Sequence, residues 1–379
     1  MLESVPIWMW PVGFLLILGP LVTVHELGHY LVGRWFGVKA EAFSVGFGKE
    51  IAGFNDRRGT RWKLSVLPLG GYVQFKGDMN PASMPDREAI RNLSPEERDG
   101  SFEQAALWQR ALIVFAGPAT NIIVAIAIFA AFLMVFGKSV PADPATENII
   151  AEFAEESPAR DAGLQVGDRI TAVDGEQLTD FRHLLRLVAL YPNKNIALTY
   201  VRNGQEVTVP ITIGSVSTTD NFGNESTVGR IGISPAPFET EMMPVGPIDA
   251  VVLGARQTVD VTDMMVTGLV QIITGKRSVR EMGGPIKIAK FSGEQLSLGL
   301  TQFVWFAAMI SLNLAFINLL PIPALDGGHL AFYAAEAIRR KPVGPQGTEW
   351  AYRIGVGMVL TLMVFVTIND VISLPIFSG

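Results

Sequence analysis

Hydrophobic residues gather in four long runs along the chain, and polar residues dominate the stretches between them. The runs are residues 7–35, 111–136, 300–324 and 352–368. Each is close to the ~20 mostly apolar residues that a membrane-spanning helix needs. No Lys or Arg precedes the first run, and it continues into a polar HELGH segment rather than a small-residue cleavage site, so we interpret it as a retained helix. The pattern predicts a polytopic α-helical membrane protein with four transmembrane helices.

Basic residues beside the runs predict how the chain crosses the bilayer, because short cytoplasmic loops are enriched in Lys and Arg. These residues are Arg34, Lys39, Arg110, Arg339, Arg340 and Lys341. We therefore expect residues 35–105 and 337–350 on the cytoplasmic side. Both termini and the long segment 138–298 are expected on the outer side.

Two stretches after the first run are β-rich and punctuated by glycine. They read FSVGFG (43–48) and WKLSVLPLGGYVQF (62–75), and they are too apolar for an ordinary exposed loop. We expect a small sheet or hairpin that dips into the membrane as a reentrant β element, where protein or a water cavity satisfies its backbone. Residues 76–104 are polar and are expected to form a mobile connection.

The region between the second and third runs predicts a compact α+β domain. TDFRHLLRLVAL (179–190) fits an amphipathic helix with Thr179 or Asp180 as N-cap. Asn203-Gly204 is a strong hairpin signal, and GRIGIS (229–234) predicts the last strand.

Amphipathic helical stretches follow this domain, and EMGGPIKIAKF (281–291) is expected to lie along the membrane surface. Together the patterns divide the chain into seven segments. The expected segments are a first span (1–34), the reentrant β region with its connection (35–105), a second span (106–137), the α+β domain (145–238), membrane-surface helices (245–298), a third span (299–335) and a fourth span (350–372).

The composition agrees with a membrane protein and limits the available chemistry. Apolar residues make up 49% of the chain and charged residues only 17%. The net charge of −6 argues against a nucleic-acid partner. Because the chain has no cysteine, disulfides, thiolate ligands and a cysteine nucleophile are excluded, and any metal must be held by nitrogen or oxygen.

The HELGH segment places two histidines and a glutamate inside the first hydrophobic run. On a helix, His25 and His29 lie one above the other on one face, so both imidazoles can bind one zinc ion. Glu26 lies beside them and could take a proton from water. Ionisable side chains within a membrane are costly, at about +2.5 to +3.5 kcal/mol each, and are rarely present without a function. The segment therefore predicts a metal site in the membrane.

A catalytic zinc usually has three protein ligands, and the third hydrophobic run offers candidates. It ends in NLLPIPALDGGHL (318–330), where two prolines break the helix. Asp326 could be a helix N-cap on its own, but beside HELGH the interpretation as a ligand is favoured. His329 competes with it as a third ligand.

Two asparagines within the runs leave alternatives open. Asn318 could hydrogen-bond a neighbouring helix, or it could contact a substrate backbone or a developing oxyanion. Asn121, in GPATN (117–121), could join helices as a packing residue, the interpretation that we favour, or support a metal ligand from behind.

The order HELGH, GFG, PLGGYV, GPATN and NLLPIPALDGG resembles the site-2 proteases, and among them the bacterial regulator-of-sigma-E protease group. The resemblance implies that His25, His29 and Asp326 bind one zinc per chain, that His329 is not a ligand and that Glu26 is the catalytic acid and base. It further implies substrate contacts at Asn318 and in the reentrant β element. There we expect them at Gly70, Gly71 and Tyr72.

The α+β domain resembles a circularly permuted PDZ domain, on the stretch SPARDAGLQVGDRITAVDG (157–175). The resemblance makes Arg230, Ile231, Gly232 and Ile233 the peptide-binding loop. The sequence contains one such domain, whereas the best-known enterobacterial relatives carry two in tandem. We expect this domain to control access rather than chemistry.

These observations predict an intramembrane zinc metalloprotease that cleaves single-pass membrane proteins within their spans. The resemblance implies an anti-sigma factor as substrate, with signal-peptide remnants as a further class. It places the chain in the bacterial inner membrane, with the PDZ domain and both termini in the periplasm. A metal or ion transporter with the same His/Asp cluster is the alternative, although the four runs contain no visible inverted repeat.

Overall fold

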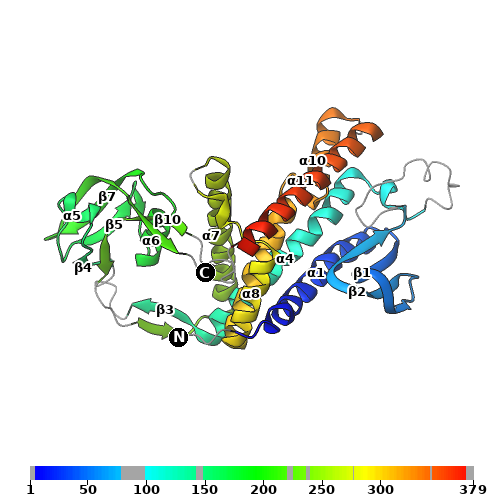
Figure 1. Ribbon diagram of the computed structural model, residues 1–379, viewed down its shortest axis with the longest axis horizontal. Helices are drawn as coiled ribbons and strands as arrows, with labels where there is room; N and C mark the ends of the chain where they lie inside the picture. The colour runs from blue at the N-terminus through cyan, green and yellow to red at the C-terminus, as the bar shows by residue number, and fades with distance from the viewer. Residues whose placement is uncertain are drawn as a thin grey trace. The chain divides into compact units, whose positions relative to one another are not determined.

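The computed structural model describes most of the chain (Figure 1). The described residues are 5–77, 99–141, 148–219, 225–235, 240–275, 277–341 and 344–372. The expected mobile connection falls largely in residues 78–98, outside the described residues. The chain forms two compact units. The helical unit comprises residues up to 131 together with 251–262 and 283–372, and the inserted unit comprises 132–250 and 263–282.

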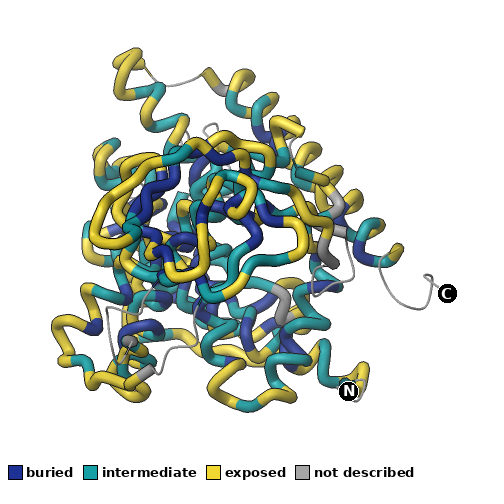
Figure 2. The backbone as a smooth tube through the Cα atoms, turned by 90° about the vertical axis from the view of Figure 1, so that its left-hand side faces the viewer, coloured by how far each residue is buried: buried dark blue, intermediate teal, exposed yellow. Residues whose placement is uncertain are grey.

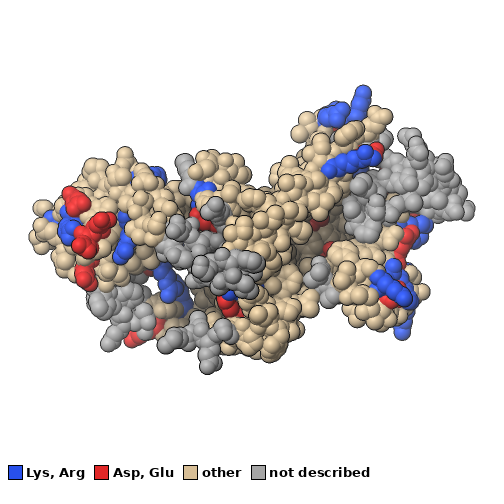
Figure 3. Space-filling model, viewed as in Figure 1, with Lys and Arg blue, Asp and Glu red and all other residues tan. Residues whose placement is uncertain are grey.

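Four helices in the described residues are long and apolar enough to cross a membrane. They are α1 (Met9–Trp35), α4 (Leu107–Phe136), α9 (Leu300–Leu319) and α11 (Pro345–Ile372). The four predicted runs are thus confirmed as helices. Figure 3 shows few charged side chains along the visible face of these helices, while Lys and Arg gather near the ends of α10 (Asp326–Arg339) and around the β-hairpin.

Two further helices complete the helical unit. The first half of α7 (Pro247–Ile273) packs closely on α4, because a Cβ at Gly254 would lie 3.0 Å from the Ile126 carbonyl oxygen. Helix α8 (Pro285–Ser297) packs along α1, where a Cβ at Gly13 would lie 2.6 Å from the Ser292 carbonyl. The depth of α8 in the bilayer stays a prediction.

The predicted β element is an antiparallel pair, β1 (Ala40–Asn55) and β2 (Arg61–Phe75). Both strands bend, so that Val45 pairs with Gly71 on one side and with Leu64 on the other. The end of β2, residues 71–75, therefore forms an edge of this small sheet. The fold also explains the glycine at 46, which has a φ of +92° that L side chains rarely adopt.

The inserted unit is an α+β domain with short strands. Its elements are β3 (Lys138–Pro141), β4 (Ile150–Phe153), α5 (Pro158–Asp161), β5 (Arg169–Val173), β6 (Glu176–Gln177), α6 (Phe181–Ala189), β7 (Asn195–Arg202), β8 (Gln205–Thr212), β9 (Gly214–Thr219), β10 (Glu225–Arg230), β11 (Ile233–Pro235) and β12 (Thr240–Met243). Buried and exposed stretches both occur in this unit (Figure 2), and the middle positions of β5 and β7 are mostly buried. The buried positions form one apolar core around Leu198 and Ile213, both fully buried.

Local predictions in this unit agree with the structure. Asp180 is the N-cap of α6 and accepts a hydrogen bond from the His183 N–H. The hairpin between β7 and β8 turns at Asn203 and Gly204, with φ values of +54° and +77°. The β9–β10 pair was not predicted, because its Ser- and Thr-rich sequence lacks an apolar face.

Candidate metal centre

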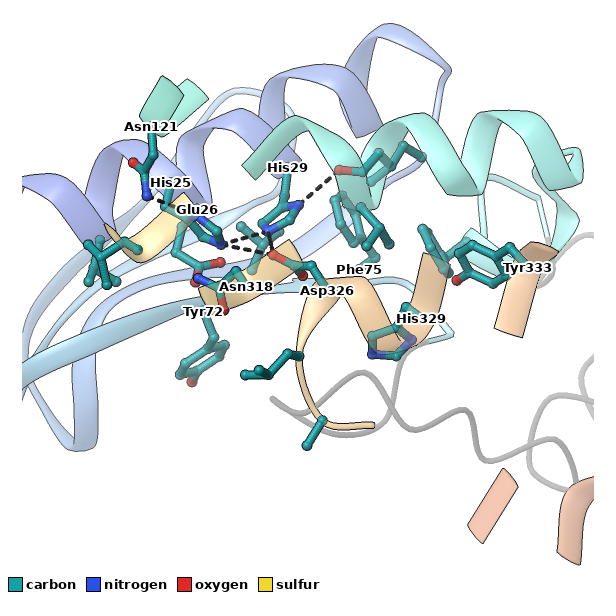
Figure 4. Close-up of a pocket in the computed structure, with 18 residues that line it drawn as sticks. His25, Glu26, His29, Tyr72, Phe75, Asn121, Asn318, Asp326, His329 and Tyr333 are labelled. Atoms are coloured by element: carbon teal, nitrogen blue, oxygen red, sulfur yellow. Dashed lines mark hydrogen bonds and ion pairs between the residues drawn. The ribbon is translucent and has the colours of Figure 1, made fainter. Parts of the chain in front are cut away.

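Two helices bring the predicted metal ligands together in the helical unit (Figure 4). His25 and His29 face inward from α1, at 7% and 8% exposure. Asp326 is the first residue of α10, just after the proline-containing loop. The Nε2 atoms of the two histidines are 3.2 Å apart, and Asp326 Oδ2 lies 3.1 Å from His25 Nε2 and 3.6 Å from His29 Nε2.

These distances fit a single zinc ion. Nitrogen and oxygen ligands about 2.0–2.1 Å from a tetrahedral zinc lie roughly 3.3–3.4 Å from one another. Asp326 Oδ2 is buried and, among the described residues, has no hydrogen-bond partner. A buried carboxylate oxygen without a partner is costly, and it faces two imidazole nitrogens. A cation would stabilise all three atoms.

The tautomer of His29 also suits a metal. Its Nδ1 lies 2.8 Å from the backbone oxygen of Ile113 on α4, and only an N–H there can donate to a carbonyl. In the neutral ring, Nε2 then carries the lone pair that a metal needs. Such a hydrogen bond from the second ring nitrogen is the usual support of a metal-binding histidine.

His25 is supported by Asn121, the residue that sequence reasoning favoured as a packing residue. The Asn121 side chain is fully buried, and its amide nitrogen Nδ2 lies 3.3 Å from His25 Nδ1. The two ends of an amide have the same shape, and with Oδ1 turned to the ring Asn121 would accept the Nδ1 proton. Asn121 also joins helices, because its backbone oxygen accepts a hydrogen bond from Ser311 on α9 at 2.8 Å. Both interpretations of Asn121 therefore find a contact in the structure.

Glycines of α1 and α4 make room for the centre. A Cβ at Gly117 would overlap His29 Nε2 and would lie 2.8 Å from His25 Nε2. A Cβ at Gly28 would overlap Thr120 and Ala116 of α4. No role was assigned to Gly117 from the sequence alone. The spacing of Gly117 and Asn121, four residues apart on one face of α4, was the available signal that both residues contact the site.

Glu26 lies between the metal ligands and the β-hairpin. Its carboxylate lies near the backbone N–H of Val73 on β2. Its Cγ would lie 3.3 Å from a Cβ at Gly71. Gly71 thus allows the edge strand to pass close to Glu26. Gly70 allows it to pass the Phe47 ring, which a Cβ there would overlap.

A cavity of about 220 Å³ opens beside these groups. Its lining includes His25, Glu26, His29, Tyr72, Asn121, Asn318, Asp326 and His329. Asn318 and Tyr72, both predicted substrate contacts, therefore line the cavity that holds Glu26 (Figure 4). His329 lies one turn beyond Asp326, outside the cluster of ligand atoms, and its ring is hydrogen-bonded to the Tyr352 hydroxyl.

The predicted peptide-binding loop lies in the inserted unit, between β10 and β11. Arg230 is exposed, whereas the Ile231 side chain belongs to the apolar core. Gly232 has a φ of +72°, and Ile233 pairs with Phe153 of β4. The Ile231 side chain is therefore not available to a ligand, and its carbonyl oxygen accepts hydrogen bonds from the Ala159 N–H and the Ser157 hydroxyl.

Two histidines one turn apart, a carboxylate from a distant segment and a neighbouring glutamate define the site of a zinc metallopeptidase, here among helices long enough to cross a membrane. Comparison with known proteins agrees. The sequence pattern described as "Peptidase family M50" matches residues 13–362. The chain belongs to this family, the site-2 proteases, and is a zinc metalloprotease. Family membership favours hydrolysis over the transporter alternative.

Curated relatives cover nearly the whole chain. A protein of Agrobacterium fabrum named "Putative zinc metalloprotease Atu1380" is 44% identical over 96% of this chain and 96% of its own length. The metalloprotease MmpA of Caulobacter vibrioides is 35% identical over 97% and 96%. Among solved structures, the PDZ domain of an SdrC-like protein from Listeria monocytogenes matches with 18% identity and a TM-score of 0.19. That match covers 24% of this chain and 88% of that one.

Proposed function

We propose that this zinc metalloprotease cleaves single-pass membrane proteins within their transmembrane segments. The observation that carries the proposal is the cluster of His25, His29 and Asp326, which lies among helices with the length and composition of membrane spans. A peptide bond that reaches this cluster would be cut where the substrate itself crosses the bilayer. An anti-sigma factor is the proposed substrate, with signal-peptide remnants as a second class.

His25, His29 and Asp326 would hold one zinc ion per chain. When bound, zinc supplies a Lewis acid that polarises the scissile carbonyl and makes water more acidic. Glu26 takes the proton of the attacking water and returns it to the leaving amine. Asn318, on the cavity wall, donates its amide N–H to the substrate backbone or to the developing oxyanion.

The substrate helix must unwind, because its carbonyls are hydrogen-bonded within the helix. The edge of β2 offers a partner for the extended chain, as in other cases of β-strand addition. The Val73 N–H points towards Glu26, whereas the Lys76 N–H points back to Lys39 of the sheet. By alternation, the backbone groups of Gly71 therefore face the site, and Tyr72 projects beside it.

We propose the following membrane arrangement. The protein lies in the bacterial inner membrane as a multi-pass protein, with both termini and the inserted unit, as a PDZ domain, in the periplasm. The β-hairpin enters the membrane from the cytoplasmic side. Its sheet exposes apolar side chains, which supports contact with lipid. They are Phe47, Ile51, Phe54, Leu64, Val66 and Leu67.

The test uses purified full-length protein and a labelled single-pass substrate. Wild-type protein should cut within the span. Glu26→Gln should retain zinc and lose about 10²–10⁴-fold in kcat, because an amide cannot accept the proton. Cleavage outside the span, or wild-type turnover by Glu26→Gln, would contradict the proposal.

A further inference from the structure

The C-terminal helix α11 lies against the loop that carries Asp326. Gly355 is buried, and a Cβ at this position would overlap the carbonyl oxygen of Pro323 and lie 2.7 Å from its carbonyl carbon. Real Cβ contacts with backbone are not this short. The α11 backbone is therefore in direct contact with the loop, three residues before Asp326.

A second contact from the same face of α11 lies beyond Asp326. Tyr352, one turn before Gly355, is 1% exposed. Its hydroxyl is hydrogen-bonded to the His329 ring, and the two ring centroids are 5.4 Å apart. His329 is one turn after Asp326 in α10. Helix α11 thus contacts the chain on both sides of the metal ligand.

The loop between α9 and α10 has a conformation that depends on its surroundings. Ala324 has a φ of +89°, in a region that non-glycine residues rarely adopt. Such residues cost of order 1–3 kcal/mol each and persist only where neighbouring structure holds them. A Cβ at Gly327 would overlap the carbonyl oxygens of Leu319 and Leu320, so the loop is also folded tightly on itself.

The other end of α11 is attached to the frame that carries the histidines. Asp370 is fully buried and accepts hydrogen bonds from the N–H groups of Gly284 at 2.9 Å, Ile286 at 3.0 Å and Lys287 at 3.0 Å. These groups form the N-terminus of α8, and α8 packs along α1. Helix α11 therefore connects the loop of Asp326 to the helix of His25 and His29.

We propose that α11 sets the position of Asp326 relative to the two histidines, with Gly355 and Tyr352 as positioning residues. This inference rests on the proposed metal site. Outer contacts that orient metal ligands typically change metal affinity by about 10–100-fold. A shift of the Pro323 backbone should therefore change how the metal is held without removing any ligand.

Two glycines of α11 provide a matched pair for the test. Gly355 contacts Pro323, whereas no described atom lies within 4 Å of a Cβ at Gly357. We would load purified full-length protein with Co²⁺ and measure its dissociation constant by competition with a chelator, together with its visible absorption spectrum. Gly355→Ala should bind Co²⁺ about 10-fold more weakly than wild type, with a changed spectrum. Gly357→Ala should match wild type.

Tyr352→Phe adds no atom, so it should fold, and it removes the hydroxyl contact with His329. It should weaken Co²⁺ binding about 3-fold to 10-fold, in the same direction as Gly355→Ala. If both variants bind Co²⁺ as wild type does, with the same spectrum, the inference is wrong. It is also wrong if Gly357→Ala is weakened equally. Failure of the wild-type protein itself to bind Co²⁺ would instead overturn the metal site.

Discussion

Two aspartates with buried carboxylate oxygens, Asp326 in the helical unit and Asp168 in the inserted unit, have opposite surroundings. Asp168 is 1% exposed and accepts hydrogen bonds from the Arg202 guanidinium at 2.6 and 2.7 Å and from the Gln165 N–H at 2.7 Å. Asp326 Oδ2 has no hydrogen-bond partner in the described part of the chain and faces two imidazoles.

The contrast separates a structural carboxylate from one that we propose to bind a metal. Burial of a carboxylate is costly unless its oxygens are paired or hydrogen-bonded. At Asp168 the protein provides those partners itself, so the group stabilises the domain and needs nothing else. At Asp326 an oxygen is left for a cation. The hydrogen-bond partners of a carboxylate therefore distinguish a structural role from metal binding. The degree of burial alone does not.

The largest effect is expected at Asp326. The free energy of zinc binding at a structural site with four ligands is about 10–16 kcal/mol. Loss of one ligand should therefore lower zinc affinity by more than about 100-fold. Asp326→Asn should therefore lose zinc and activity, measured by metal analysis and chelator competition. His329→Ala, one turn away, is the comparison and should weaken zinc binding far less, by about 3-fold to 10-fold, because it removes only the contact with Tyr352. The reverse result would make His329 the third ligand and remove the contrast with Asp168.

The corresponding change at Asp168 should affect stability and not zinc. Loss of its charged pairing with Arg202 should lower the stability of the inserted unit by about 2–3 kcal/mol, since removing one partner of a well-buried pair costs about 3–5 kcal/mol and Arg202 is partly exposed. Hydrogen exchange of the β7 amides in full-length Asp168→Asn measures this. Lowered zinc occupancy with unchanged exchange would contradict the assignment.

The pH dependence of this effect has a definite sign. Burial raises the pKa of Asp168, but the hydrogen bonds from Arg202 and Gln165 outweigh it, so the pKa is lowered in the folded domain. The stabilisation is then complete above the unfolded value of about 3.9 and is lost as the pH falls through the folded pKa. The difference in exchange between wild type and Asp168→Asn should shrink below about pH 4. A difference that grows on acidification would refute this account.

A smaller effect is expected at Asn121, which supports His25 from behind. Asn121→Ala should weaken zinc binding by about 10-fold, because the His25 ring loses the group that orients it. Chelator competition provides the measurement. Ser311→Ala is the control, because it removes the hydrogen bond to the Asn121 backbone and leaves the amide in place. Equal zinc affinity in wild type and Asn121→Ala would make Asn121 a packing residue alone.

The smallest effect is expected at Arg230, at the surface of the inserted unit. If the loop binds a free C-terminal carboxylate, Arg230→Glu should lower the affinity for such a peptide about 5-fold, which is the effect expected from one exposed charge pair. Fluorescence anisotropy with a carboxylate peptide and its amidated form would measure this. Ile231→Asp is unsuitable, because the Ile231 side chain lies in the core. If wild type and Arg230→Glu each bind the carboxylate peptide and the amidated peptide equally, the domain only excludes bulky substrates.

The features that could be predicted from sequence are those that depend on neighbours along the chain. The four helices follow from their apolar runs, and the pairing of His25 with His29 follows from helical spacing. The hairpin at Asn203 and Gly204 follows from turn chemistry. Asp326 could be proposed because Pro321 and Pro323 break an apolar helix beside it, a local signal again.

The features that were missed depend on contacts between distant segments. Gly117 leaves room for histidines about 90 residues earlier in the chain. Asn121 contacts His25, a role that the sequence analysis kept only as the less favoured alternative, because the sequence of this segment suits simple helix packing equally well. Gly355 has no distinguishing signal in its own helix, because Gly357 looks the same in the sequence. The β9–β10 pair was missed for a different reason, since Ser and Thr alternate there without an apolar face.

The proposed ligands of the metal come from distant parts of the chain, with His25 and His29 in α1 and Asp326 at the start of α10, just after the third span. During synthesis, the ribosome must therefore complete most of the protein before the centre can assemble. Until Asp326 is in place, the metal site beside Glu26 is incomplete and hydrolysis cannot occur. A chain that stops early, or that fails to insert its third span, leaves an inert fragment in the membrane and not an unregulated protease. Assembly of the whole fold is thus the first control on this enzyme, ahead of any substrate.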